Sequence, residues 1–221
     1  MRIYDLNNFS SIINSCANAQ TKKLMIGIIG YPGAGKTAAL QYYSQNNRNV
    51  YYLRVRKSMT AKDFYIRLLE SMGLKNTMRE LPIHFIMNKI AGNLNLSTKP
   101  NLIIIDEAGK FKPKQLEYIH ELRDMTDGTT GIVLAGPEYF RDNLDSWKKD
   151  NVIGIPELHR RIFDFIELDR PKYAEVKLLC SEYGVKDEKL AIKIHREADN
   201  FASIVFMIYK ELERRGGTEP N

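Results

Sequence analysis

The sequence GYPGAGKT, residues 30–37, decides the fold of this chain. It matches the pattern G-x-x-x-x-G-K-[ST], and it follows the apolar run LMIGII at residues 24–29. That run is short and β-branched, which predicts a strand buried on both faces. A helix is expected to begin near Gly35. A strand that leads through a glycine loop into a helix is the context that this pattern requires, so the stretch predicts a phosphate-binding loop.

The residue types in this loop suit the phosphates of ATP. Glycines let the backbone curl so that its N–H groups face an anion, and the positive end of the following helix dipole adds to that attraction. Lys36 is expected to reach the β- and γ-phosphates, and the Thr37 hydroxyl is expected to bind Mg²⁺. The predicted ATP contacts are Gly30, Pro32, Gly33, Ala34, Gly35, Lys36, Thr37 and Ala38.

A second apolar run, LIII at residues 102–105, leads into Asp106 and Glu107. A strand over 101–105 places these acids at the carboxyl end of the sheet, where ligands bind in open α/β folds. Asp106 would hold Mg²⁺ through water, and Glu107 would polarise the water that attacks the γ-phosphate. Exposed acids at a strand end are common. It is their pairing with the phosphate loop that favours an ATP-hydrolysing site.

Strand and helix signals alternate along the first 168 residues. Further strands are predicted at 49–55, 131–135 and 163–168 from their β-branched and aromatic content, which makes five strands in total. Helices are predicted at 5–19, 60–72, 82–92, 113–125 and 156–161, with a short one beginning at Pro137. This alternation predicts an α/β fold with a five-stranded parallel sheet between helices.

The pattern changes beyond Leu168. Residues 171–183, 187–197 and 201–214 show only helical periodicity, so a domain boundary is predicted near Arg170. Residues 1–170 would form the α/β domain, with its N-terminal helix at 5–19. Residues 171–215 would form a small helical domain, and residues 216–221 are expected to be a flexible tail.

A basic segment, His159-Arg160-Arg161, lies just before the fifth predicted strand. In oligomeric ATPases an arginine at such a place can enter the neighbouring subunit's site and act on the γ-phosphate. Arg160 and Arg161 are therefore candidate catalytic residues, with Arg160 slightly preferred. The alternative is that one of them caps the end of a helix or is simply solvated.

Together these features resemble those of the AAA+ ATPases over roughly residues 20–215. The resemblance rests on the glycine loop, the Asp106-Glu107 pair, the segment ELHRRI at 157–162 and a three-helix appendage that looks like a lid domain. Two segments, IDEAGKFKPKQLE at 105–117 and GIVLAGPE at 131–138, look like transposition-regulator ATPases of the MuB and TnsC type. They are also similar, less closely, to helicase loaders and origin-recognition ATPases.

The resemblance implies an ATP-dependent DNA-binding ATPase that assembles head-to-tail, as a helix or a ring, on duplex DNA and recruits a transposase. Two departures imply slow or partner-dependent hydrolysis. The fourth strand ends in LAGP at 134–137 without a polar residue, and Ala202 stands where a lid arginine is expected. The alternatives are a helicase-loader-like ATPase and an ATP-binding scaffold with no DNA role.

Four cations surround the end of the second predicted strand, namely Arg54, Arg56, Lys57 and Lys62. In the resembled family this region follows the DNA backbone, so these four are the predicted DNA contacts. Arg54 and Arg56 would share one face of the strand, because side chains alternate with period 2. A solvated strand end is the alternative. The tyrosines at 42, 43, 51 and 52 are expected to pack in the core and in interfaces rather than to stack on bases.

The bulk composition is that of a globular chain long enough to bury a core, with 221 residues, 43% hydrophobic and 27% charged. The formal net charge of +6 leans toward nucleic acid or another anionic surface. Cys16 and Cys180 lack the spacing of a metal site or a disulfide framework. The chain shows neither a signal peptide nor an apolar stretch of membrane-spanning length, so we expect a cytoplasmic protein with no membrane partner.

Overall fold

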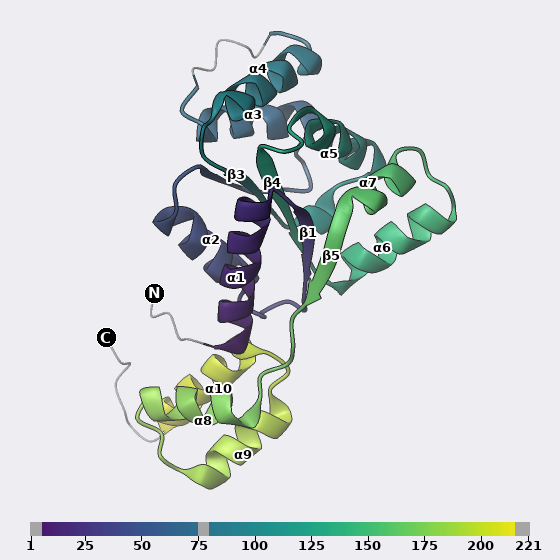
Figure 1. The fold of residues 1–221 in the computed structure, drawn as a ribbon. Helices are drawn as coiled ribbons and strands as arrows, with labels where there is room; N and C mark the ends of the chain where they lie inside the picture. Colours follow the sequence, from purple (N-terminus) through teal and green to yellow (C-terminus); the bar gives the residue numbers. More distant parts are fainter. Residues whose placement is uncertain (1–5, 75–79, 215–221) are drawn as a thin grey trace.

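A computed structural model describes residues 6–74 and 80–214 of the chain. Its centre is a five-stranded sheet in the order β2-β3-β4-β1-β5, and every neighbouring pair of strands is parallel (Figure 1). The predicted five-stranded parallel sheet is therefore confirmed. The strands are β1 Met25–Ile29, β2 Val50–Arg54, β3 Asn101–Asp106, β4 Thr130–Gly136 and β5 Ile162–Glu167.

Helices cover both faces of the sheet (Figure 1). One face packs against α1 (Asn7–Lys22) and α2 (Lys36–Asn46). The other face packs against a larger group, which comprises α3 (Ala61–Ser71), α4 (Ile83–Leu96), α5 (Pro113–Met125), α6 (Glu138–Lys149) and α7 (Ile155–Arg161). The α/β part of the molecule thus has two hydrophobic cores with the sheet between them.

The central strand β3 shows how the sequence divides between the two cores. Leu102 and Ile104 enter the core beneath α1 and α2, whereas Ile103 and Ile105 enter the core on the other face. Successive side chains of a strand point to opposite faces, so a strand covered on both sides must be apolar throughout. This continuous apolar run sets Asp106, which follows it directly, at the carboxyl edge of the sheet.

Some element ends differ from the prediction. The helix α4 continues through Gly92 to Leu96, because the buried side chain of Leu94 outweighs the modest helix penalty of one glycine. The helix α6 is twelve residues long rather than short. The strand β2 ends at Arg54, so Arg56 lies in the following turn and does not share a strand face with it.

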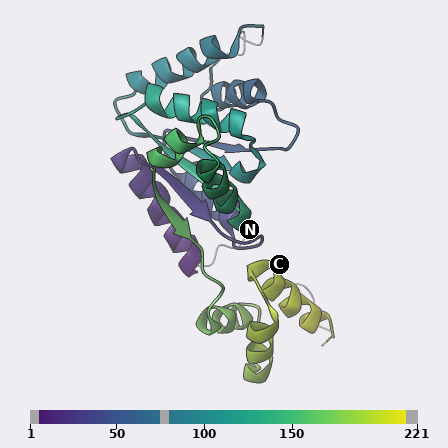
Figure 2. The same cartoon turned by 90° about the vertical axis from the view of Figure 1, so that its right-hand side faces the viewer.

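The three C-terminal helices, α8 (Tyr173–Glu182), α9 (Glu188–Glu197) and α10 (Phe201–Arg214), form a bundle with its own core. Figure 2 shows this bundle beyond the carboxyl ends of the strands, joined to β5 by an extended segment. The predicted tail, residues 216–221, lies outside the described residues. No helix in residues 6–74 and 80–214 is both long and apolar enough to cross a lipid bilayer.

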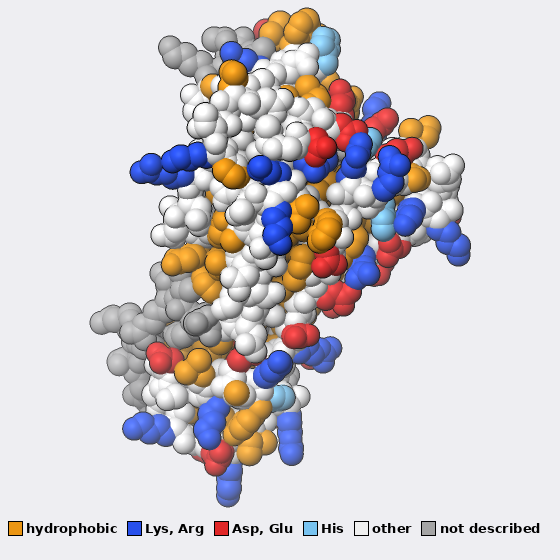
Figure 3. Space-filling model, viewed as in Figure 1, with side chains coloured by type: hydrophobic (Ala, Val, Ile, Leu, Met, Phe, Trp, Pro, Cys, Tyr) orange, Lys and Arg blue, Asp and Glu red, His pale blue; other side chains and the backbone are white. Residues whose placement is uncertain are grey.

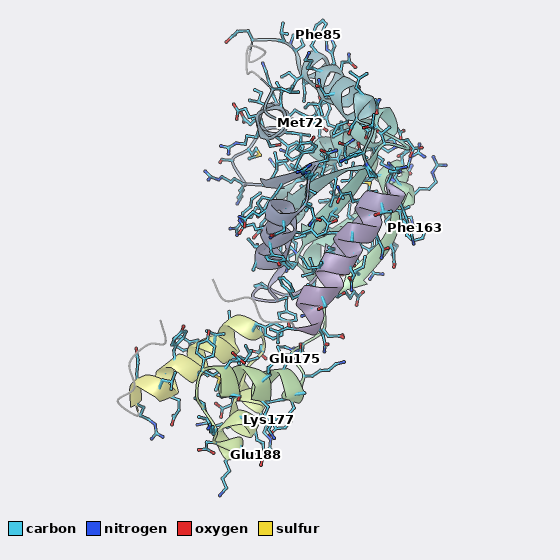
Figure 4. All side chains as sticks on the ribbon, turned by 60° about the vertical axis from the view of Figure 1, so that its left-hand side comes forward. Met72, Phe85, Phe163, Glu175, Lys177 and Glu188 are labelled. Atoms are coloured by element: carbon cyan, nitrogen blue, oxygen red, sulfur yellow. The ribbon has the colours of Figure 1, made fainter. Side chains whose placement is uncertain are left out.

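The bundle is attached to the N-terminal end of α1. The buried carboxylate of Glu175 lies at this junction (Figure 4) and accepts a hydrogen bond from the backbone N–H of Asn7 at 2.9 Å. The side chain of Asn8 donates to the carbonyl of Asp169 and accepts from its N–H. These bonds place α1 and the bundle on the two sides of the cavity described next.

Candidate nucleotide site

A cavity of about 910 Å³ opens at the carboxyl edge of the sheet, which is where parallel α/β sheets bind ligands. The predicted phosphate loop forms its floor, and the ends of β2 and β3 form one side. Helices α1 and α10 supply apolar walls, although they are about 190 residues apart in the chain. The cavity therefore joins the α/β domain to the C-terminal bundle.

The phosphate loop has the backbone that its glycines predict. Gly33 and Gly35 have φ angles of 85° and 87°, a left-handed conformation that side-chain-bearing residues rarely adopt. The helix α2 begins at Lys36, so the N–H groups of its first turn lack helical acceptors and point toward the cavity. The predicted contacts that line the cavity are Pro32, Gly33, Ala34, Gly35, Lys36, Thr37 and Ala38.

Gly30 differs from the other predicted contacts, because it does not line the cavity. A Cβ at this position would lie 2.9 Å from the Cβ of Leu168, so the glycine is needed where the loop passes the end of β5. Its carbonyl accepts a hydrogen bond from the Lys36 ammonium, and the Tyr31 carbonyl accepts another at 3.1 Å. Lys36 therefore rests on its own loop, and burial lowers its pKa against the opposing effect of Asp106 and Glu107.

Asp106 and Thr37 meet beneath the loop. The Thr37 hydroxyl donates to Asp106 Oδ2 at 2.8 Å, and the Asp106 side chain is almost fully buried. Tyr52 of β2 donates to the same oxygen at 2.8 Å, while the Glu107 N–H donates to Oδ1 at 2.9 Å. Hard oxygen donors from two elements, next to a phosphate loop, are the donor set that suits Mg²⁺. The residues present thus fit the predicted metal.

Glu107 lies at the rim of the cavity in a strained conformation, with φ of 62°. Its carboxylate contacts two cations, Arg54 Nη2 at 3.1 Å and Lys110 Nζ at 3.2 Å. Partial burial opposes the charge, but the hydrogen bonds from these two cations outweigh it and hold the pKa of Glu107 below its ordinary value. A carboxylate held in this way is a weak base, so its release from Arg54 or Lys110 would strengthen it.

The DNA contact predicted for Arg54 stays a prediction, and the structure adds contacts at the nucleotide cavity. Arg54 lines the nucleotide cavity, pairs with Glu107, and has its Nε 3.9 Å from Asp106 Oδ2. Arg56 and Lys57 are exposed in the turn after β2, and Lys62 is half-buried in the first turn of α3. Arg54 thus contacts the carboxylates of the cavity, and the DNA contacts predicted for all four cations stay predictions.

Arg160 and Arg161 lie on α7, at the amino end of β5 and away from the chain's own phosphate loop. Arg161 forms an ion pair with Asp124 of α5 at 2.9 Å. Arg160 is exposed and has no ion pair with any residue of the described ranges. Figure 3 shows acidic and basic side chains intermixed around α6 and α7. The arginine-finger role stays a prediction, and the geometry leaves Arg160 the freer of the two.

The apolar part of the cavity could not be seen in the sequence. Leu6, which directly precedes α1, and Phe9 of α1 contribute one wall. The other wall comes from the bundle through Tyr183, Phe201, Ala202, Val205, Phe206 and Tyr209. A Cβ on Gly33 would lie 2.7 Å from Asn200 Oδ1 and 3.3 Å from the Cβ of Ala202, so the start of α10 touches the loop. Ala202 is at the position expected for a lid arginine, and the contact there is apolar. No local motif marks these residues, because they converge only in the folded chain.

A family model described as an AAA domain matches residues 19–144, more than half of the chain. The chain belongs to this AAA family. Its fold is the AAA+ fold, as a structure of the Aeropyrum pernix ORC2 protein also indicates. That likeness has a TM-score of 0.65 at 15% identity, and it covers 96% of this chain and 64% of the other. At this identity the likeness shows the fold alone.

Two proteins named "ATP-dependent target DNA activator B" are similar to this AAA chain. The one from Escherichia phage D108 is 24% identical over 187 residues, and the one from Escherichia phage Mu is 24% identical over 188 residues. Each match covers 85% of this chain and 58% of the relative. The chain thus spans somewhat more than half the length of the relatives it matches. The resemblance to a transposition-regulator type of AAA+ ATPase is confirmed.

Proposed function

We propose that this chain binds ATP with Mg²⁺ in the cavity, hydrolyses it, and uses it to switch assembly on duplex DNA that recruits a transposase. The observation that carries the nucleotide part is the contact between Thr37 and Asp106 beneath a glycine loop with an open helix N-terminus. The transposition part is supported by the similarity to two phage proteins named as ATP-dependent target DNA activators.

The roles proposed for the phosphate-site residues follow from their positions. Bound Mg²⁺ would supply charge neutralisation between the β- and γ-phosphates. Thr37 and Asp106 would hold it, and Lys36 would turn from the carbonyls of its own loop toward the phosphates. Glu107 would orient the attacking water, once the cations that hold it have loosened.

The charges around the cavity suggest that the site is completed by a second copy of the chain. In the described lining, the cations Lys36 and Arg54 are balanced by the carboxylates Asp106 and Glu107. Little positive charge is left for the γ-phosphate, and α10 offers Ala202 in place of an arginine. An exposed arginine from a neighbour would meet this need, and Arg160 is the candidate. Head-to-tail contacts of this kind give a helix or a ring on DNA.

The DNA-facing surface is proposed at the turn after β2. Arg56 and Lys57 are exposed there, and Lys62 follows at the N-terminus of α3. Cations of this kind contact phosphate oxygens without reading the base sequence, and they release counterions on binding. Arg54 lies two residues before Arg56 and pairs with Glu107. DNA at this turn would therefore be close enough to influence the ATP site.

The test is fluorescence anisotropy of labelled duplex DNA at two salt concentrations, with ATP, a non-hydrolysable analogue, ADP or no nucleotide. We expect tight, salt-sensitive binding with ATP or the analogue, and its loss in Lys36→Ala. Arg56→Glu with Lys57→Glu should also abolish binding. The matched control is Lys189→Glu with Lys193→Glu, which makes the same charge change at exposed positions of α9 and should have a much smaller effect.

The possible outcomes separate the competing functions. If the chain binds no DNA in any of the four nucleotide conditions, the DNA part of the proposed function is overturned and an ATP-binding scaffold remains. A labelled single strand of the same length is measured in parallel, and tighter binding of this strand than of the duplex would favour a helicase-loader-like role. Equal losses in the two double variants would mean that net charge, rather than the turn after β2, governs the interaction.

A further inference from the structure

Tyr52 makes a contact that the sequence did not foretell. It lies on β2, and its hydroxyl donates to Asp106 Oδ2 at 2.8 Å. The strand register sets Tyr52 beside Ile104, two residues before Asp106, so its half-buried ring lies on the face covered by α1 and α2. The sequence predicts that this tyrosine packs in the core or an interface, and its ring does pack in the core. The hydroxyl contact with a buried carboxylate is an additional feature of the structure.

The Asp106 carboxylate has three hydrogen-bond donors from three parts of the chain. Tyr52 and Thr37 both donate to Oδ2, and the Glu107 N–H donates to Oδ1. Together they fix the rotation of the side chain about its terminal bond. A cation lies near the same oxygen, because Arg54 Nε is 3.9 Å from Oδ2, within ion-pair distance but too far for a hydrogen bond. Arg54 is therefore a candidate partner for this oxygen if one of its donors is lost.

We propose that Tyr52 is a positioning residue for the Mg²⁺ site, which keeps Asp106 Oδ2 against Thr37 and prevents its closer pairing with Arg54. The inference rests on the proposed function, since it assumes that Thr37 and Asp106 hold the metal. The metal-binding geometry is then already formed before nucleotide and Mg²⁺ arrive. Residues that orient a metal ligand commonly change metal affinity about 10- to 100-fold when they are replaced.

The neighbouring residue provides a matched control. Tyr51 lies on the same strand, but its ring packs in the core on the opposite face of the sheet. Tyr51→Phe and Tyr52→Phe therefore delete the same hydroxyl from adjacent positions of one strand, and only the second removes a contact to Asp106. Both variants keep the ring and its packing, so both are expected to fold.

The experiment is a titration of Mg²⁺ into the full chain with a fluorescent ATP analogue, followed by a measurement of analogue affinity in EDTA. Tyr52→Phe should raise the Mg²⁺ concentration at the midpoint about 10- to 100-fold. Its affinity in EDTA should stay within about twofold of the wild type, because the phosphate loop is unchanged. Tyr51→Phe should match the wild type in both measurements.

Each other outcome overturns the inference. An unchanged Mg²⁺ midpoint in Tyr52→Phe would show that the hydroxyl does not position Asp106. Equal losses of affinity with Mg²⁺ and in EDTA would show that the hydroxyl matters only for packing. A wild-type chain that binds no analogue under either condition would overturn the proposed function itself, which distinguishes that failure from a failure of the role of Tyr52.

Discussion

Replacement of Gly131 by alanine tests how α1 is held on the sheet. A Cβ on Gly131 in β4 would lie 2.2 Å from the backbone oxygen of Ala19 and 2.7 Å from its carbonyl carbon. Ordinary carbon–oxygen contacts begin at about 3.3 Å, so α1 would have to move by roughly 1 Å. The obstacle is backbone, which cannot rotate away as a side chain could.

The expected loss of stability follows from this geometry. Overpacking usually costs about 1–3 kcal/mol. Gly131→Ala should lie at the upper end, because α1 cannot shift without disturbing the fully buried Ile12 and Cys16. For a chain of this size each kcal/mol lowers the melting temperature by about 2–4 °C, which predicts a decrease of about 6–12 °C.

Thermal unfolding can be followed through Trp147, the only tryptophan in the chain, which lies on α6 and reports on the α/β domain. The control is Gly92→Ala, since a Cβ there meets nothing within 4 Å and the site is inside α4. That change should raise the melting temperature by about 2–4 °C, because alanine favours a helix over glycine by about 1 kcal/mol. A Gly131→Ala chain that melts within about 2 °C of the wild type would refute the close approach of α1 and β4.

Three further predictions concern the cavity. Gly33→Ala should displace the bundle from the phosphate loop, because the new Cβ would collide with Asn200 at the start of α10. Energy transfer between a fluorescent donor on the loop and an acceptor on the bundle would detect the displacement. Gly35→Ala is the control, since it has the same backbone strain but its Cβ meets nothing within 4 Å, and it should leave the bundle in place. Arg54→Gln should raise the pKa of Glu107, because a hydrogen bond from Arg54 helps to keep that pKa low. The acid limb of the pH profile of ATP hydrolysis should then move to higher pH. An acid limb at the wild-type pH would contradict the pairing of Arg54 with Glu107. Glu175→Ala should destabilise the attachment of the bundle by about 1–3 kcal/mol, because the backbone N–H groups of Asn7 and Lys172 lose their acceptor. Relative to the wild type, amide hydrogen exchange should become faster at this junction and stay unchanged in the sheet.

The phosphate loop and the acids after β3 could be predicted because each is a contiguous stretch. Lys36 and Thr37 follow a glycine loop whose backbone conformation depends on its own residues, and Asp106 follows a strand that is apolar on both faces. The start of α3 is local in the same sense, because Thr60 and Asp63, three residues apart, exchange hydrogen bonds in a capping box. Short-range periodicity and backbone propensity are sufficient for features of this kind.

The contacts of Arg54 with Asp106 and Glu107 could not be predicted in this way. The position of Arg54 after a strand and before further cations favoured a DNA contact, and the parallel register of β2 and β3 sets it beside Asp106, with Glu107 within reach. Strand order and register depend on contacts across the whole sheet, and no local signal in β2 announces that β3 is its neighbour. The contact of the Tyr52 hydroxyl with Asp106 depends on the same register.

The sequence alone therefore determined the α/β class, the five parallel strands, the phosphate loop and the pair of acids that follows β3. Only the tertiary structure decided which cations hold Glu107, which hydroxyl orients Asp106, and that α1 and α10 enclose one cavity. The physical reason is the range of the interactions. Motifs and periodicity record the local conformation of neighbouring residues, whereas the site is completed by side chains whose meeting depends on how distant segments pack.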